Sequence, residues 1–252
     1  MASGQILEQE IRNHWGKRFH CPPGDLTQEG SLIVRDGELQ DSGSVLIYHI
    51  GSRSIVRLDP SLADRLQIAN GQVLATSISQ DDLQVILRLG LRHTARLAQQ
   101  TMGSYFYLDP PNFTPRRVDF PGILVRIDPE TEAGLILSLC QACTAEEVQT
   151  AEIDANQPDA IIFGHILDGN LVSYAGFRYW DERFADIGVL THPLQRGKGL
   201  AKAGTSSLCE WCIEHQVIPM YRVEDANRAS FNIPLSLGFT KKVEIEVLKV
   251  VY

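Results

Sequence analysis

The chain has 252 residues, 44% of them hydrophobic and 21% charged, which is enough for a packed core in one large domain or two small ones. The formal net charge is −8 and the basic residues are scattered, which argues against a nucleic-acid or acidic-membrane partner because those need a clustered positive field. The amino-terminal residues lack a signal-peptide pattern, no apolar stretch reaches the roughly 18 residues of a membrane span, and the five cysteines show no disulfide-framework spacing. We therefore expect a cytoplasmic protein.

The first half of the chain predicts a smaller α+β region. The expected elements are a strand over Ser44–Leu58 broken at Gly51, a short helix over Pro60–Ile68, a helix over Asp82–Gln100 interrupted by Gly90, and a strand over Ser104–Leu108. No phosphate-binding or catalytic motif occurs in this half. We expect residues 1–117 to shape an acceptor site or to have a regulatory role, rather than to hold a cofactor.

A proline-rich connector separates the two halves of the chain. The segment Leu108–Gly122 contains Pro110, Pro111, Pro115 and Pro121. Proline fixes φ and removes a backbone donor, so this segment is predicted to form neither a helix nor a central strand. We place the domain boundary between residues 117 and 118, with a second domain over 118–252.

The second half predicts the order β-α-α-β-β-β-α-β-α-β, an α+β plan with one parallel crossover at its centre. Two apolar β runs flank Asp168-Gly169, a strong hairpin signal because both turn residues tolerate positive φ. The expected elements are Ile123–Ile127, Glu130–Cys143, Ala145–Ile153, Ala160–Leu167, Leu171–Phe177, Arg183–Thr191, Lys198–His215, Ile218–Glu224, Asn227–Leu237 and Lys241–Val251.

The segment 189–202 is predicted to run from a strand through a tight turn into a long helix. Gly197 and Gly199 allow the backbone to bend sharply and to approach a ligand closely. The amides beyond them lie at a helix N-terminus, which favours an anion such as a pyrophosphate. Three basic residues surround the same turn: Arg196, Lys198 and Lys202.

Two common phosphate-binding motifs are excluded at this turn. It is not a P-loop, because Lys198 is followed by Gly199 instead of Ser or Thr. It is not a dinucleotide fingerprint, because Lys202 stands where the third glycine belongs. A glycine-rich strand-to-helix turn without a ligand is the alternative interpretation.

The run Arg196-x-x-Gly199-x-Ala201 on such a turn resembles the acetyl-CoA loop of the GNAT superfamily of acyltransferases. A second signature of that family follows at the usual distance: Asn227-x-x-Ser230, then Leu237-Gly238-Phe239 at the end of the next helix. The resemblance covers about residues 119–252 and is closest to a branch with an extra N-terminal region, which includes antibiotic self-resistance acetyltransferases. It implies a GNAT-like mixed sheet with flanking helices.

The resemblance implies an N-acetyltransferase that passes the acetyl group of acetyl-CoA to a primary amine by direct attack in a ternary complex. A strand backbone would pair with the pantetheine arm, the glycine-rich turn would hold the pyrophosphate, and the next helix would line the same channel. The implied acetyl-CoA-binding residues are Val189, Leu190, Thr191, Arg196, Gly197, Lys198, Gly199, Leu200, Ala201, Lys202, Asn227 and Ser230.

An amine must lose a proton before it attacks, and two carboxylates are candidates for the general base. Asp186 lies in the strand that leads into the cofactor loop, and Glu224 ends the next strand; we favour Asp186. The alternative for each is a solvated or salt-bridged carboxylate. Many family members have a tyrosine seven residues after the Asn, and it acts as the general acid for the departing CoA thiolate. This chain has Pro234 at that position. The absence of the tyrosine predicts a slower enzyme or a substitute acid.

Two other interpretations stay open. A catalytically silent CoA-binding module is favoured by Pro234, whereas the intact loop favours an enzyme. The pairs Cys140-x-x-Cys143 and Cys209-x-x-Cys212 are a possible zinc site, but both fall in predicted helices, where buried thiols acting as small apolar residues explain them as well. We expect no bound metal. The sequence identifies neither the acceptor amine nor the oligomeric state.

Overall fold

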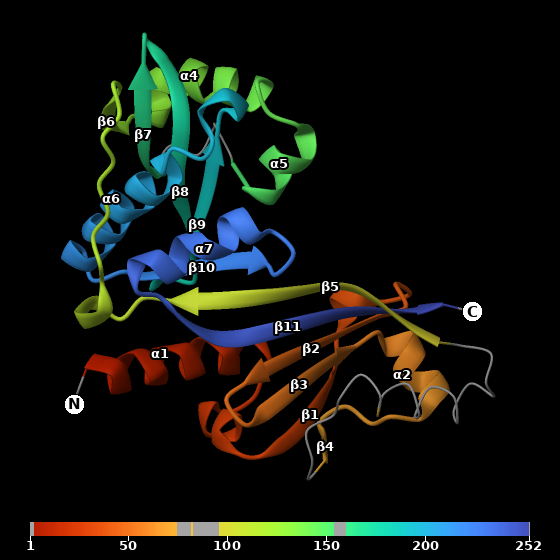
Figure 1. Cartoon of the computed structure of the whole chain (residues 1–252). Helices are drawn as coiled ribbons and strands as arrows, with labels where there is room; N and C mark the ends of the chain where they lie inside the picture. Colours follow the sequence, from red (N-terminus) through yellow and green to blue (C-terminus); the bar gives the residue numbers. More distant parts are fainter. Residues whose placement is uncertain (1–2, 75–81, 83–95, 154–159, 252) are drawn as a thin grey trace. The chain divides into compact units, whose positions relative to one another are not determined.

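The computed structural model describes residues 3–74, 82, 96–153 and 160–251 (Figure 1). The chain divides into two compact units, which are described separately. The first comprises Met1–Tyr105, Val223–Asn227 and Lys241–Tyr252, and the second comprises Phe106–Arg222 and Arg228–Thr240. This division is not the one expected at residue 117, because two carboxy-terminal segments belong with the amino-terminal unit.

The first unit is built around strands in the order β4-β1-β3-β2-β11-β5. The strand β1 pairs in parallel with β3, while β2 runs antiparallel to both β3 and β11. Its elements are α1 (Ser3–Arg18), η1 (Pro23–Thr27), β1 (Gly30–Arg35), η2 (Gly37–Leu39), β2 (Ser44–Ile50), β3 (Arg53–Leu58), α2 (Pro60–Leu66), β4 (Gln72–Leu74), β5 (Arg96–Tyr107) and β11 (Thr240–Val251).

Several predictions for this half are confirmed and one is wrong in part. The expected strand does break at Gly51, where φ is +59°, and α2 forms with Pro60 at its start. The helix expected over Asp82–Gln100 is wrong at its end, because Arg96–Gln100 form the start of β5 beside β11. Residues 83–95 of that prediction lie outside the described residues. Strand pairing overrides local helix propensity here.

The helix α1 was not predicted, although its sequence carries a signal. Leu7, Ile11 and Trp15 are buried and lie four residues apart, on one face of the helix. The Trp15 ring packs on Tyr48 of β2 at 5.3 Å and on Tyr105 of β5 at 5.1 Å between ring centroids. Aromatic packing therefore holds α1 on this sheet.

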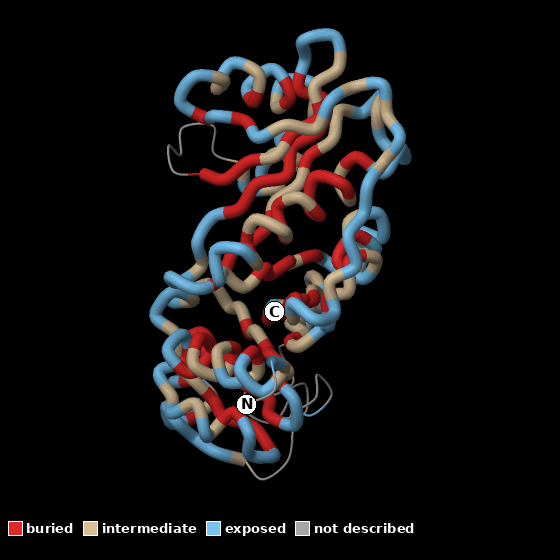
Figure 2. The backbone as a smooth tube through the Cα atoms, turned by 90° about the vertical axis from the view of Figure 1, so that its left-hand side faces the viewer, coloured by how far each residue is buried: buried red, intermediate tan, exposed pale blue. Residues whose placement is uncertain are grey.

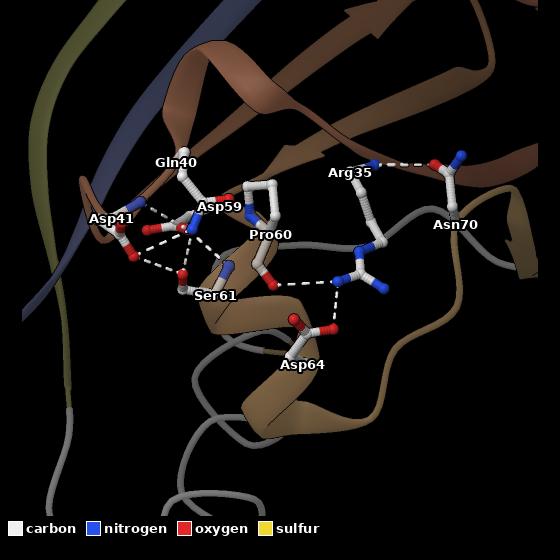
Figure 3. A network of polar contacts seen from close by, with 8 residues as sticks. All are labelled: Arg35, Gln40, Asp41, Asp59, Pro60, Ser61, Asp64 and Asn70. Carbon is white, nitrogen blue, oxygen red and sulfur yellow. Dashed lines mark hydrogen bonds and ion pairs between the residues drawn. The ribbon is translucent and has the colours of Figure 1, made fainter.

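A polar network orders the turn between η2 and β2 and the start of α2 (Figure 3). The buried Asp59 carboxylate accepts hydrogen bonds from three backbone amides, those of Asp41 (3.2 Å), Gly43 (2.6 Å) and Ser61 (2.8 Å). Asp59 is thereby the N-cap of α2. Its three amide partners account for its burial, so it is a structural residue.

The second unit contains strands in the order β10-β9-β8-β7-β6. The element order confirms the sequence prediction from β6 onward, and the proline-rich connector holds only one short 3-10 turn. The hairpin at Asp168-Gly169 is confirmed, with φ of +50° and +77°. The elements are η3 (Pro110–Asn112), β6 (Ile123–Ile127), α4 (Pro129–Gln141), α5 (Ala145–Thr150), β7 (Ile161–Leu167), β8 (Asn170–Trp180), β9 (Phe184–Thr191), η4 (Pro193–Gln195), α6 (Leu200–Glu214), β10 (Ile218–Glu224) and α7 (Arg228–Leu237).

Helices cover both faces of the sheet of the second unit. Tyr174 of β8 packs with Ile136 and Leu139 of α4, whereas a Cβ on Gly204 of α6 would lie 3.0 Å from the Cβ of Ala175. Neighbouring strand residues point to opposite faces, so α4 and α6 lie on opposite sides. Buried residues run along these strands and along α6, and Figure 2 colours buried stretches of the chain red. The mixed α+β fold class is confirmed.

Candidate functional site

The parallel strands β9 and β10 pair over only part of their length. Their register runs from Ile218 opposite Phe184 to Met220 opposite Asp186. In Figure 1, β9 then points to the top of the view and β10 to the right. Within the described residues, 187–191 have no strand partner on the side away from β8. This part of β9 therefore has a described strand partner on one side only, although the Thr191 carbonyl accepts from Arg196 Nε at 3.1 Å.

The turn after β9 presents a row of unpaired amides. Gly197 and Gly199 adopt φ of +78° and +81°, and Gly199 is the N-cap of α6. The helical hydrogen bonds begin with Ala203, whose amide donates to the Gly199 carbonyl at 3.1 Å. The amides of residues 197–202 donate to no backbone carbonyl in the part of the chain described. Six such amides at a helix N-terminus have the hydrogen-bonding capacity and the dipole that suit an anion.

The two glycines are needed for backbone conformation rather than for space. A Cβ on Gly197 would have no atom within 4 Å, and one on Gly199 would meet only Val118 Cγ2 at 3.7 Å. Both positive φ values are strained for other residues. The open space beside each glycine lets a ligand approach the backbone closely.

The cationic side chains of the turn have different partners. Arg196 Nη1 lies 2.8 Å from Glu147 of α5, and its Nε donates to the Thr191 carbonyl at 3.1 Å. Arg196 lowers the pKa of Glu147 to about 2. Lys198 Nζ lies 2.5 Å from Gln195 Oε1 and is exposed. Arg196 thus ties α5 to the end of β9, while Lys198 faces solvent.

The second family signature lies at the start of α7. The Asn227 amide donates to the Glu224 carbonyl at 2.9 Å, and Asn227 belongs to the first unit. The Ser230 hydroxyl lies 2.7 Å from the hydroxyl of Tyr221, which burial keeps neutral by raising its pKa. Pro234 is buried inside α7. Tyr221 was missed from the sequence because nothing distinguishes it from a core aromatic residue in a strand.

Asp186 is held by two arginines. Its side chain is 5% exposed, both its oxygens accept from Arg222 Nε at 3.0 Å, and Arg178 Nε lies 3.5 Å from Oδ2. The β8–β9 register is continuous at this point, with Arg178 directly opposite Asp186, so no bulge turns Asp186 away. Both oxygens of this buried carboxylate are therefore engaged by guanidinium groups.

Glu224 has a different environment. It is exposed at the end of β10, in the first unit, and its carboxylate has no hydrogen bond or ion pair among the described residues. Sequence reasoning named both carboxylates but missed the arginines around Asp186. Charged residues inside otherwise apolar strands, such as Arg222 in β10, are the signal that was available.

The two cysteine pairs differ in position. Cys209 and Cys212 are buried within α6, as expected, and burial raises the pKa of Cys212 to about 12. Cys140 lies in the last turn of α4, but Cys143 lies beyond the helix, which corrects the expectation for that pair. All five cysteines are free, and no cluster of three or more His, Cys, Asp or Glu side chains suited to a metal ion occurs among the residues described.

One family model matches part of the second half of the chain. Residues 163–248 match the family model described as GNAT acetyltransferase, a span that includes β9, the glycine-rich turn and α6. No curated protein sequence matches the chain. None of the helices described is long and apolar enough to cross a membrane.

Several solved structures are similar to parts of this chain at low sequence identity, each with a TM-score below 0.5. A GNAT-family acetyltransferase from Colwellia psychrerythraea is 18% identical over 77% of this chain and 75% of its own, with a TM-score of 0.49. A GCN5-related N-acetyltransferase-like protein from Streptococcus suis is 18% identical over 89% and 90%, with a TM-score of 0.48. A Salmonella typhimurium structure that contains acetyl-CoA is 17% identical over 52% and 94%, with a TM-score of 0.41.

Proposed function

We propose, on the premise that residues 163–248 belong to the GNAT acetyltransferase family, that this chain transfers the acetyl group of acetyl-CoA to a primary amine of a small molecule or protein. The observation that carries the proposal is the row of six unpaired amides over residues 197–202, directly after a strand with an open edge. Such a row suits the pyrophosphate of CoA, because it offers both hydrogen-bond donors and the positive end of a helix dipole.

The chain would hold acetyl-CoA largely through its backbone. Val189, Leu190 and Thr191 lie on the part of β9 that has no partner opposite β8, so they can pair with the pantetheine amides as an added strand. The amides from Gly197 to Lys202 would bind the pyrophosphate. Asn227 and Ser230 are proposed to line the same channel, and Arg196 keeps the loop in place through Glu147 and Thr191.

The transfer forms a C–N bond to the amine and breaks the C–S bond of the thioester. The bound thioester would supply the electrophilic carbonyl, and one amide of β9 would donate a hydrogen bond to it. The amine attacks directly in a ternary complex and releases one proton. The CoA thiol leaves as its anion, which a pKa of about 8.5 permits without a tyrosine at the position of Pro234.

Asp186 and Glu224 remain the two proposed acceptors of the amine proton. Asp186 is the candidate that the sequence favours, and the contacts of the two carboxylates support a proposal of the opposite order. Both oxygens of Asp186 already accept hydrogen bonds from Arg222, whereas the Glu224 carboxylate has no such bond within the residues described. On this ground Glu224 is the better base, and Asp186 is better suited to positioning.

A catalytically silent CoA-binding module is the second candidate, and Pro234 is the feature that favours it. The two functions are separated by measuring CoA thiol release from acetyl-CoA with a panel of primary amines, against controls without amine. Acetyl-CoA should raise the Tm in either case, because a ligand of the folded state stabilises it by mass action. Amine-dependent release shows the enzyme. A Tm shift without release shows the silent module, and no Tm shift contradicts both.

A further inference from the structure

Two arginines and two carboxylates meet on one face of β9 in the second unit. Arg222 Nη2 lies 2.5 Å from the carboxylate of Asp186 and 2.6 Å from that of Glu152. Glu152 is in the turn after α5. Arg178 contacts the same two carboxylates, Asp186 through Nε at 3.5 Å and Glu152 through Nη2. The cluster of Arg178, Arg222, Asp186 and Glu152 is electrically balanced only while Glu152 is present.

The two carboxylates are held with different strength. The Asp186 side chain is 5% exposed and accepts from Arg222 through both oxygens, so it is a fixed part of the sheet. The Glu152 side chain is 38% exposed and comes from a residue in the left-handed region, with φ of +51°. An exposed ion pair is weak, and a left-handed conformation is strained for Glu. Glu152 can therefore leave while Asp186 stays.

The cluster lies beside the proposed acetyl position. Asp186, Gly188 and Leu190 share the face of β9 toward α4 and α5, and a Cβ on Gly188 would lie 2.1 Å from the Ala151 carbonyl oxygen. The Glu152 carboxylate thus occupies a place next to the strand that would carry the thioester. The Arg222 guanidinium also lies 5.0 Å from the centroid of the Trp180 ring, which orients it and adds an apolar wall.

We propose that Arg178 and Arg222 bind a carboxylate of the acceptor, in the place that Glu152 occupies when no acceptor is bound. The acceptor is then an amine that also carries a carboxylate, such as an amino acid or a peptide end. Guanidinium groups bind carboxylates through paired hydrogen bonds, so a carboxylate of the acceptor can take the place of the exposed Glu152 carboxylate. The identification of this carboxylate with the acceptor rests on the proposed acetyltransferase function. Binding of a carboxylate to Arg178 and Arg222 can be tested without enzyme turnover.

The first test measures binding of pentanoate, a simple carboxylate, to the full chain by NMR titration with and without acetyl-CoA. Glu152→Gln removes the competing charge and should bind pentanoate at least about tenfold more tightly than wild type. Glu152→Ala should behave in the same way, which covers the case that the Gln variant folds poorly. Adding Arg178→Gln to either variant should abolish the gain.

Matched controls remove charge elsewhere in the same unit. Glu146→Gln removes an exposed carboxylate of α5, and Arg126→Gln removes an exposed guanidinium of β6. Neither substitution should change the affinity for pentanoate. No gain in Glu152→Gln and Glu152→Ala, or a gain that survives Arg178→Gln, would overturn the inference. Pentanoate binding can be measured without acetyl-CoA. Failure of the proposed acetyltransferase function is therefore seen in other measurements, as the absence of a Tm shift with acetyl-CoA or of thiol release.

The second test uses a matched pair of amines, 5-aminopentanoate and pentylamine, in the thiol-release assay. The carboxylated amine should have the higher kcat/KM in wild type, by about tenfold or more. Arg178→Gln should raise KM for 5-aminopentanoate and leave KM for pentylamine unchanged. Equal kcat/KM for the two amines in wild type, with pentanoate binding absent as well, would contradict the inference.

Discussion

At the scale of single residues, the glycines of the turn after β9 have a defined conformational role. Gly199 has φ of +81° and space around it, so a β-branched residue is excluded by conformation and not by a clash. We expect Gly199→Val to weaken acetyl-CoA binding at least about tenfold, and more than Lys198→Gln, because the row of amides would be displaced. Isothermal titration of each variant with acetyl-CoA measures the difference.

Gly71 provides the control for this substitution. It also has positive φ (+74°) with no atom near a would-be Cβ, but it lies in the turn before β4 in the first unit. Gly71→Val should cost stability through the same backbone strain, of the order of 1–2 kcal/mol, without changing acetyl-CoA affinity. Equal affinity in wild type and Gly199→Val would show that the loop is not the binding site.

The pair of Arg196 and Glu147 makes stability depend on pH. The folded-state pKa of Glu147 is about 2, below its ordinary value of 4.5, so the pair stabilises the fold fully above pH 4.5 and loses its effect as the pH falls toward 2. Glu147→Gln should lower the Tm near neutral pH, and this difference from wild type should vanish near pH 2. Thermal unfolding from pH 7 to pH 2 measures it.

Glu146→Gln is the matched control, since Glu146 is the exposed neighbour of Glu147 in the first turn of α5. It should follow wild type over the whole pH range. A Glu147→Gln difference that persists unchanged down to pH 2 would mean that the ion pair is not its cause.

At the scale of elements, the two candidate bases come from different strands, Asp186 from β9 and Glu224 from the end of β10. Glu224→Gln should lower kcat/KM by about 10²- to 10⁴-fold at neutral pH, with acetyl-CoA affinity nearly unchanged and partial recovery at high pH, where the amine is already neutral. Asp186→Asn should instead lower the Tm and raise KM for carboxylated amines, because it releases Arg178 and Arg222. Rate profiles against pH for both variants test this division.

The outcomes distinguish a base from a positioning residue. A loss of kcat that high pH restores in Asp186→Asn would reverse the order of the two carboxylates. Two profiles that superimpose on that of wild type would mean that neither residue accepts the proton.

At the scale of the whole molecule, β11 limits where the chain can be cut. Residues 243–249 of β11 pair with 44–50 of β2, and Leu248 and Val250 are buried among residues of β2 and β3. A fragment of residues 118–252 lacks β2, so β11 keeps an apolar strand without its partner. We expect this fragment to aggregate, as measured by size-exclusion chromatography and circular dichroism.

A fragment of residues 118–240 is the control, because it lacks the orphaned strand and should be the more soluble of the two. A monomeric 118–252 fragment with full acetyl-CoA affinity and full acceptor activity would contradict both this expectation and the proposed role of residues 1–117 in shaping the acceptor site.

Local signals in the sequence were sufficient for the element order from β6 to β11, for the Asp168-Gly169 hairpin and for the turn that carries Gly197 and Gly199. Each depends on residues close in the chain: the period of apolar residues, the φ tolerance of glycine, and the free amides that start any helix. Only tertiary structure decided that β11 belongs with β2 in the first unit, and that Asp82–Gln100 ends in a strand.

The surroundings of Asp186 depended on tertiary structure for the same reason. Arg222 lies 36 residues from Asp186 and 70 from Glu152 in the chain, and strand register and the turn after α5 bring them together. No short-range sequence pattern predicts these contacts, because they depend on which strands pair and in which register. The sequence by itself therefore located the glycine-rich turn after β9, which depends on local residues, whereas the charge cluster around Asp186 became visible only in the assembled sheet.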